Sequence, residues 1–298
     1  MIYSRTKMKK IFIQMLLYTV FSQTVNANIA KWTPIISQDI ILFAPDPLMN
    51  AEQLKFTEQL ISIFENGTST IQYNYAEHLD DGHGITAGRA GFTSATGDML
   101  EVIQRYTQVK SEHKLKKYIS ELERLEDIYA DHDYTLSKEG ADVSHLIDAE
   151  EDLNLIEDWK SVSKDSTFNR IQDEIVDTLY YYPVRDMAQK IDAKLPISLL
   201  YLYDANIQLG KDKVKEIIDD ISEKTPKNGG SEVTWLKEFN TLRRDILLTT
   251  TVDGEKIWED TIYRVDVLDD LLKNKNYYLT PCTITIEAWD NEKFSLPN

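Results

Sequence analysis

Cysteine is nearly absent from this sequence of 298 residues, in which Cys282 stands alone. A single cysteine excludes an intramolecular disulfide, so the fold must be held by its hydrophobic core. A chain of this length can bury a sizeable core, either as one large domain or as two lobes. We expect Cys282 to be a small buried apolar side chain rather than a nucleophile.

Long hydrophobic runs are also lacking. The apolar stretch at residues 11–21 is too short to span a bilayer, and it follows a basic segment with Arg5, Lys7, Lys9 and Lys10. Val25-Asn26-Ala27 then supplies the small residues that a signal peptidase prefers. The pattern predicts a signal peptide over residues 1–27, with an uncleaved membrane anchor as the alternative. We therefore expect a secreted, extracellular protein that is free of the membrane after cleavage and begins with an N-terminal extension over residues 28–50.

Basic residues are scarce, with 33 Lys and Arg against 50 Asp and Glu. The predicted signal peptide holds four of the basic residues and none of the acidic ones, so its removal leaves a net charge of −21. Such a chain would repel the phosphates of nucleic acid, which excludes that partner. An acidic groove would instead attract a polycation, although acidity alone can also serve solubility.

Helical periodicity dominates the rest of the chain, and no internal repeat or independent linker interrupts it. The predicted fold class is mainly α, an α+β fold with a small amount of sheet. Strands are expected over residues 70–75 and 278–287, and helices over residues 51–64, 96–107, 113–129, 159–182, 188–210, 211–223, 232–248 and 256–275. The segment at 188–210 is very apolar and is expected to be a central helix, so Asp204 within it needs a charged partner if it is buried.

The segment from Ile63 to Gly97 contains the candidate catalytic residues. Glu65 ends the first helix, which Asn66-Gly67 should stop, and the negative end of the helix dipole there should raise the pKa of Glu65. Asp81 follows within a glycine-rich turn. Two carboxylates held across a cleft are what glycoside hydrolysis requires, one to protonate the leaving oxygen and one to activate water. We reject a dinucleotide site at Gly82, because no β-α-β pattern surrounds it. Calcium and zinc sites also lack the remaining ligands, and no metal is expected.

The run FENGTSTIQYNYAEHLDDGHGITAGRAGFTSATGDMLEVIQRYT, residues 64–107, resembles the catalytic segment of family 46 glycoside hydrolases. Weaker similarity extends to about Tyr278. The resemblance implies a monomeric, inverting endo-chitosanase that needs no metal or organic cofactor and binds chitosan, a polycationic polysaccharide. It also implies a lysozyme-like, two-lobed fold over residues 51–298, with a small antiparallel sheet at the cleft.

The same resemblance assigns roles to individual residues. It implies that Glu65 is the general acid, that Asp81 is the general base, and that Thr86 helps to hold the attacking water. A supporting network behind the base is implied for Asp204, Arg243 and Arg264, and contacts with the substrate are implied for Asn66, Tyr75, Glu77, His83 and Asp98.

Two residues depart from the family pattern. His83 stands where many relatives have arginine, and Leu209 stands where a sugar-contacting histidine would be expected. The first change would make one contact pH-sensitive, and the second would remove one hydrogen bond to the substrate.

Two rival functions remain at this point. One is a lysozyme-type or chitinase-type glycosidase, against which the acidic groove argues because those substrates carry acetylated amines. The other is a secreted, non-catalytic protein that binds polycations, which would not need Glu65, Asp81 and Thr86 together.

Overall fold

The structure, a computed structural model, describes residues 48–298 apart from 80–82, 130–142, 253–254 and 257. The predicted signal peptide, most of the N-terminal extension and the candidate base Asp81 therefore lie outside the described residues. The described chain forms two compact units, one containing Thr70–Tyr181 and the other the residues before Thr70 together with Tyr182–Asn298. Within these residues, no helix is both long and apolar enough to span a membrane.

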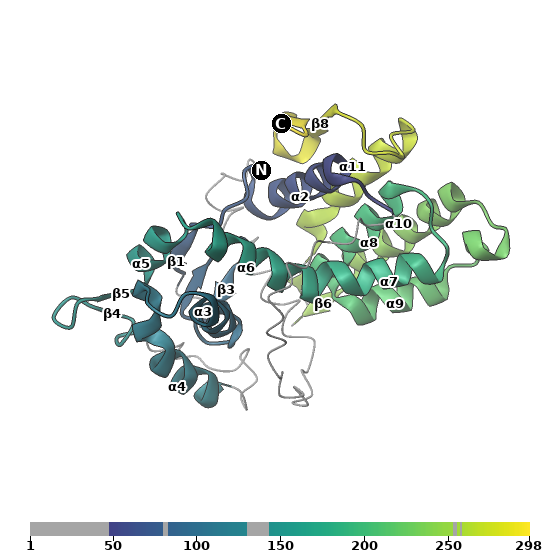
Figure 1. Ribbon diagram of the computed structural model, residues 1–298. Helices are drawn as coiled ribbons and strands as arrows, with labels where there is room; N and C mark the ends of the chain where they lie inside the picture. The colour runs from purple at the N-terminus through teal and green to yellow at the C-terminus, as the bar shows by residue number, and fades with distance from the viewer. Residues whose placement is uncertain (1–47, 80–82, 130–142, 253–254, 257) are drawn as a thin grey trace. The chain divides into compact units, whose positions relative to one another are not determined.

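The first unit combines short helices with a three-stranded sheet and a two-stranded hairpin (Figure 1). Its elements are β1 (Ala76–His78), β2 (Ile85–Ala87), β3 (Phe92–Thr93), α3 (Asp98–Val109), the 3-10 helix η1 (Lys114–Tyr118), α4 (Ile119–Tyr129), β4 (Ile147–Asp148), β5 (Leu153–Asn154), α5 (Leu155–Val162), α6 (Ser166–Val176) and the π-helix η2 (Asp177–Tyr181).

The three-stranded sheet is antiparallel in the order β1-β2-β3. Its register places Glu77 of β1 opposite Thr86 of β2, and Thr86 opposite Thr93 of β3. All three residues of β2 are buried, because this central strand lies within the core of the unit. The sheet thus brings two of the predicted site residues, Glu77 and Thr86, side by side.

The prediction of a strand over residues 70–75 is wrong. This segment makes turns, and the strand β1 begins only at Ala76. The carbonyl oxygen of Tyr73 accepts side-chain hydrogen bonds instead of entering a strand ladder. Its donors are Trp159 Nε1 at 3.0 Å, Ser163 Oγ at 3.0 Å and Gln172 Nε2 at 3.3 Å. Tertiary contacts therefore override the β propensity of the segment.

Five predicted helices also need correction. One helix ends at Lys190 and the next begins at Pro196, so the helix expected over residues 188–210 is broken, and the one expected over 256–275 begins only at Ile262. The helix expected over residues 113–129 is divided into η1 and α4, and the one over 159–182 is interrupted after Val162. There the side chain of Asp165 accepts from the Thr167 N–H and starts α6 as a new helix. The helix expected from residue 96 begins at Asp98, and the residue before it, Gly97, makes no side-chain cap.

The backbone at Gly88 lies close to the side chains of Gln172 and Trp159, so a larger residue at this position should destabilise the protein. Its φ of +77° is left-handed, and an added Cβ would lie 2.5 Å from Gln172 Oε1 and 2.9 Å from Trp159 Cζ2. Gly67 has a similar φ of +67°, but an added Cβ would meet nothing within 4 Å. Gly67→Ala should therefore cost about 1–2 kcal/mol, the price of the left-handed conformation. Gly88→Ala should add about 1–3 kcal/mol of overpacking. Urea unfolding of the two variants tests this difference, and equal losses would contradict it.

The second unit is almost entirely helical. Its elements are α2 (Ala51–Asn66), α7 (Tyr182–Lys190), α8 (Pro196–Leu209), α9 (Lys211–Asp220), the 3-10 helix η3 (Pro226–Asn228), α10 (Glu232–Thr249), β6 (Thr251–Val252), β7 (Glu255–Lys256), the 3-10 helix η4 (Glu259–Thr261), α11 (Ile262–Lys273), β8 (Cys282–Ile286), the 3-10 helix η5 (Glu287–Trp289) and β9 (Glu292–Leu296).

Helix α8 forms the centre of this unit, as its apolar sequence predicts. Every residue from Pro196 to Leu209 is buried, and α7, α9 and α10 pack against the helix (Figure 1). Since Asp204 is 0% exposed, its charge has to be balanced inside the protein.

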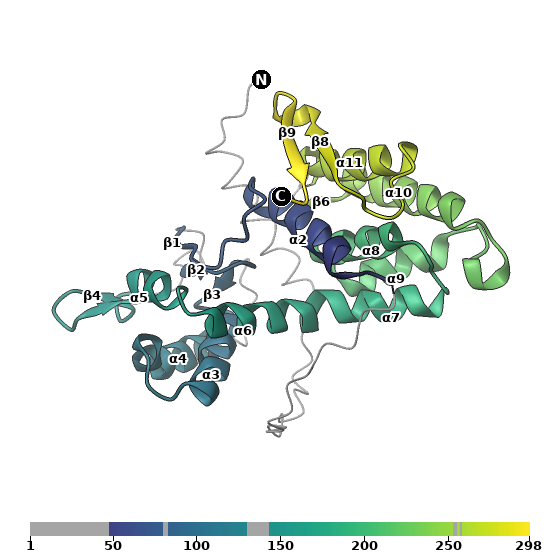
Figure 2. The ribbon, with the colours of Figure 1, turned by 45° about the horizontal axis from the view of Figure 1, so that its top comes forward.

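Helix α2 carries Glu65 in its last turn. Its start is fixed by Asn50, whose side chain accepts from the Glu52 and Gln53 N–H groups in a capping box. It ends as predicted at Gly67, which takes the left-handed conformation and donates to the Ile63 carbonyl at 2.8 Å. The hairpin of β8 and β9 packs beside α11 and α2 (Figure 2). Glu65 is therefore presented by a helix with both ends fixed.

Candidate active site

Glu65 is held by one arginine of the second unit. Arg264 in α11 donates from Nη1 to Glu65 Oε1 at 2.6 Å, and the side chains of the pair are 4% and 12% exposed, respectively. Glu65 is therefore nearly buried, yet part of its carboxyl side chain still reaches the surface.

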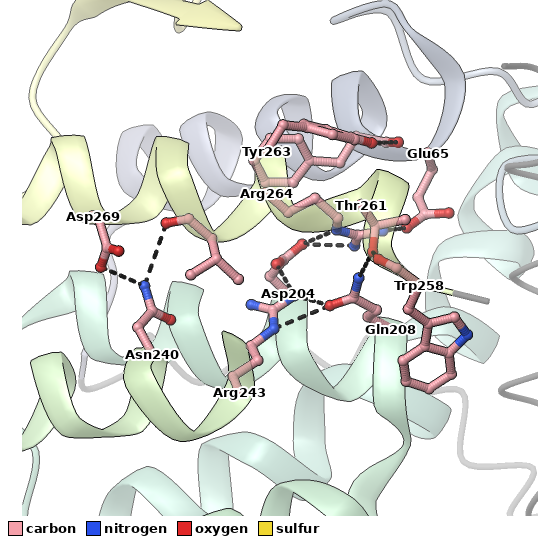
Figure 3. Close-up of polar contacts among 12 residues, drawn as sticks. Glu65, Asp204, Gln208, Asn240, Arg243, Trp258, Thr261, Tyr263, Arg264 and Asp269 are labelled. Atoms are coloured by element: carbon pink, nitrogen blue, oxygen red, sulfur yellow. Dashed lines mark hydrogen bonds and ion pairs between the residues drawn. The ribbon is translucent and has the colours of Figure 1, made fainter. Parts of the chain in front are cut away.

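Asp204 joins this pair to a second arginine (Figure 3). Its Oδ1 accepts from Arg264 Nε at 3.1 Å and Nη2 at 2.6 Å, while its Oδ2 accepts from Arg243 Nη2 at 2.6 Å. Asp204 and Arg243 are both 0% exposed. The three residues predicted to form a supporting network are thus together, and the need for a partner at Asp204 is met twice.

The network continues into Gln208 and Thr261, which were not among the predicted site residues. Gln208 Oε1 accepts from Arg243 Nε at 3.0 Å, and Gln208 Nε2 donates to Thr261 Oγ1 at 2.7 Å (Figure 3). Thr261 in turn donates to the Trp258 carbonyl at 2.6 Å. Gln208 lies four residues after Asp204, which is the spacing of neighbours on one helix face and would have been a usable signal.

Burial governs the protonation of Glu65. Burial raises its pKa above the ordinary value, and the opposing effect of Arg264 does not cancel this. Burial would also raise the pKa of Asp204, but Arg264 and Arg243 outweigh it and hold that pKa below its usual range. The predicted rise at Glu65 is thus present, but its largest cause is burial rather than the helix dipole on which the prediction was based.

In the first unit, the predicted contact residues gather around the three-stranded sheet. Tyr75 donates from its hydroxyl to Glu77 Oε2 at 3.1 Å, and Glu77 is exposed on β1. Opposite Glu77, Thr86 is 0% exposed, and its Oγ1 has no hydrogen-bond partner among the described residues. A buried hydroxyl without a partner is uncommon and calls for an explanation.

Asp98 is fixed at the start of α3. Its Oδ1 accepts from the Thr93 N–H at 2.9 Å, the Met99 N–H at 2.9 Å and the Thr96 hydroxyl at 2.6 Å. Burial raises the pKa of Asp98 to about 6, although these three donors act in the opposite direction. Thr93 faces Thr86 in the sheet, so Asp98 is tied to the strand pair that carries the other contact residues.

Three further positions singled out in the sequence can be placed. Asn66 is half-buried at the end of α2, and His83 is half-buried just after the undescribed residues 80–82. Leu209 is buried in α8. The network was predicted to lie behind Asp81. Asp81 is outside the described residues, so this placement stays a prediction. The structure instead links the network to Glu65 through Arg264, a contact that was not predicted.

The chemistry available at Glu65 is proton donation. A carboxyl whose pKa is raised by burial stays protonated nearer to neutral pH than an exposed one, and this is what a general acid requires. Among the described residues, no group of three His, Cys, Asp or Glu side chains is placed to hold a metal ion.

Solved structures share this architecture. A family 46 chitosanase from Gynuella sunshinyii, solved with chitotetraose, matches with a TM-score of 0.66 at 37% identity, covering 84% of this chain and 99% of that chain. A native chitosanase from Bacillus subtilis matches with a TM-score of 0.67 at 36% identity, covering 83% and 99%. The mainly α, lysozyme-like fold class predicted from the sequence is confirmed. The fold and these relatives define the protein as a glycoside hydrolase.

Sequence comparison defines the family. A chitosanase of Bacillus subtilis is 37% identical over 279 residues, which is 91% of this chain and 90% of that protein. A chitosanase of Streptomyces is 29% identical over 231 residues, 75% of each protein. The model of glycosyl hydrolase family 46 matches residues 59–282, and the chain belongs to this family.

Proposed function

We propose that this protein is an endo-acting chitosanase that hydrolyses β-1,4 glycosidic bonds in chitosan with inversion, using Glu65 as general acid and Asp81 as general base. The observation that carries the proposal is the nearly buried carboxyl of Glu65, with its raised pKa and its hydrogen bond from Arg264. Membership of family 46 and the chitosanase relatives support hydrolysis of this substrate.

The Arg264–Asp204 pair lets Glu65 be held without being ionised. Arg264 orients the Glu65 carboxyl through one hydrogen bond, which by itself would favour the ionised form. Asp204 binds the same guanidinium twice and neutralises its charge, which lessens the pull on the Glu65 proton. Glu65 can then deliver its proton to the leaving oxygen as the glycosidic bond breaks.

Thr86 supports the second half of the mechanism. Its buried hydroxyl has no partner in the described part of the chain, and a bound water would supply one. Asp81 belongs to the segment between β1 and β2, and β2 carries Thr86. In the proposed reaction Asp81 removes a proton from this water, which attacks the anomeric carbon from the face opposite the leaving group.

The substrate class follows from charge. Chitosan carries an ammonium group on each deacetylated sugar, and Glu77 and Asp98 are carboxylates of the first unit that can bind it. Asn66, Tyr75 and His83 are proposed as further sugar contacts. The acidic net charge of the chain would attract such a polycation from a distance.

Asp98 should make substrate binding depend on pH. Binding of an ammonium group needs the ionised carboxylate, which is present above the Asp98 pKa of about 6 and is lost as the pH falls below it. We expect Asp98→Asn to raise KM, so that the ratio of variant to wild-type KM is largest above pH 6 and approaches one below it. Titration of the substrate cancels in this ratio. Steady-state kinetics on chitosan measure it, and a ratio that does not change with pH would contradict the role of Asp98.

Release of reducing ends from chitosans of graded acetylation tests the substrate class. We expect the rate to fall as acetylation rises, because each acetyl group removes a positive charge. A rate that rises with acetylation would instead favour a lysozyme-type or chitinase-type glycosidase. Binding to chitosan without release of reducing ends would favour a non-catalytic protein.

We further propose that residues 1–27 are a signal peptide, that residues 28–50 are an extension, and that residues 51–298 form the catalytic part of a monomeric, extracellular enzyme. Mass spectrometry of protein recovered from the culture medium tests the first point. The proposal expects a mature chain that begins at Asn28, and an intact Met1 on membrane-bound protein would contradict it.

A further inference from the structure

Tyr263 contacts the backbone beside Glu65. Its hydroxyl donates to the Phe64 carbonyl oxygen at 3.2 Å, and Tyr263 directly precedes Arg264, which binds the Glu65 carboxyl. The Phe64 carbonyl belongs to the last turn of α2, where carbonyl groups lack helical partners. Two consecutive residues of α11 therefore hold Glu65, one through its side chain and the other through the preceding peptide unit (Figure 3).

The position of the Tyr263 ring is itself fixed. The ring is 4% exposed and packs edge-on to Phe64, with centroids 5.9 Å apart. On another side it packs against Trp289 of the β8–β9 hairpin at 5.0 Å, and Trp289 contacts Phe294 of β9 at 6.3 Å. The hydroxyl is thus aimed at the Phe64 carbonyl by packing that reaches the last strand of the chain.

We propose that Tyr263 is a positioning residue for the general acid, and that its hydroxyl keeps the last turn of α2 closed around Glu65. The inference rests on the proposed role of Glu65 and adds to it a residue that does not touch the substrate. Without this hydrogen bond, the end of α2 loosens and water reaches the Glu65 carboxyl. The pKa of Glu65 then falls, because burial is what raises it.

Removal of the hydroxyl should change catalysis in a direction that loss of stability alone does not explain. A general acid works only while protonated, so a lower Glu65 pKa moves the alkaline limb of the kcat–pH profile to lower pH. Misplacement by 1 Å can cost about 10²-fold in rate, so we expect Tyr263→Phe to lower kcat by about tenfold. KM should stay unchanged, because Tyr263 makes none of the proposed sugar contacts.

A matched control exists in the same unit. Tyr201 is 0% exposed and also donates its hydroxyl to a helix carbonyl, that of Leu268 at 2.8 Å, but this carbonyl is not beside Glu65. Tyr201→Phe and Tyr263→Phe each remove one buried tyrosine–carbonyl hydrogen bond and keep the aromatic ring. Both should lower Tm by similar amounts, whereas only Tyr263→Phe should lower kcat and shift the alkaline limb.

The experiment measures kcat, KM and the pH profile of both variants on chitosan, together with Glu65→Gln in the full chain. An unchanged kcat and alkaline limb in Tyr263→Phe, beside an inactive Glu65→Gln, would overturn the positioning role and leave the proposed function intact. Equal catalytic losses in the two tyrosine variants would also overturn it, since they would show general loosening. Full activity in Glu65→Gln would remove the proposed function and this inference together.

Discussion

Replacing Glu65 with glutamine should lower kcat on chitosan by about 10²–10⁴-fold, the contribution of a positioned general acid. Glutamine matches the shape of the carboxyl and keeps an oxygen that can accept from Arg264, but it has no proton to give to the leaving oxygen. The α2 cap and the Tyr263 hydrogen bond are left unchanged, so the fold should survive. Initial rates of reducing-end release, with circular dichroism to verify folding, measure the effect.

The companion variant Asp81→Asn should be as inactive, because the water would then lack a base. Arg105→Gln is a suitable control, since Arg105 forms a partly exposed i,i+4 pair with Glu101 on α3 and has no proposed role at the site. A folded Glu65→Gln protein whose kcat stays within about tenfold of the wild type would show that another group donates the proton.

Replacing Arg243 with methionine should destabilise the protein by about 3–5 kcal/mol, the usual loss when one partner of a buried ion pair is removed. Arg243 is 0% exposed and donates to both Asp204 and Gln208, so its loss leaves two buried acceptors without their donor. For a unit of this size the change corresponds to roughly 6–20 °C in Tm. Urea and thermal unfolding measure it.

The neighbouring residue supplies the control for this prediction. Arg244 lies on the same helix and pairs with Asp266 and Asp269, but its side chain is 32% exposed, and such pairs contribute about 0–1 kcal/mol. Arg244→Met should therefore unfold close to the wild type. Similar losses in Arg243→Met and Arg244→Met would show that burial of the Asp204 network is not what stabilises this unit.

The parts of the fold that local sequence determines were predicted well. The end of α2 at Gly67 follows from an Asn-Gly pair, and the burial of α8 follows from an almost uninterrupted apolar run. The segment at residues 70–75 was mispredicted because the Tyr73 carbonyl is satisfied by side chains of α5 and α6. Those donors lie roughly 90 residues away in the chain, so no local pattern contains them.

The candidate site shows the same division. Asp204, Arg243 and Arg264 were expected to act together, and the structure joins them within one unit. Their link to Glu65 was missed, because the pattern of residues does not tell which carboxyl a guanidinium faces. Tyr263 was missed for a related reason. The sequence does not show that the hydroxyl of this helical tyrosine donates to the Phe64 carbonyl, next to Glu65.

The anomeric form of the first product tests the central claim most directly. Proton NMR during the earliest minutes of chitosan hydrolysis should show the α-anomer of the new reducing end before mutarotation, since one attack by water on a β-linkage inverts the anomeric carbon. The same sample made with Glu65→Gln should show no new anomer over this time. A β-anomer as the first product of the wild-type protein would contradict the proposed roles of Glu65 as acid and Asp81 as base.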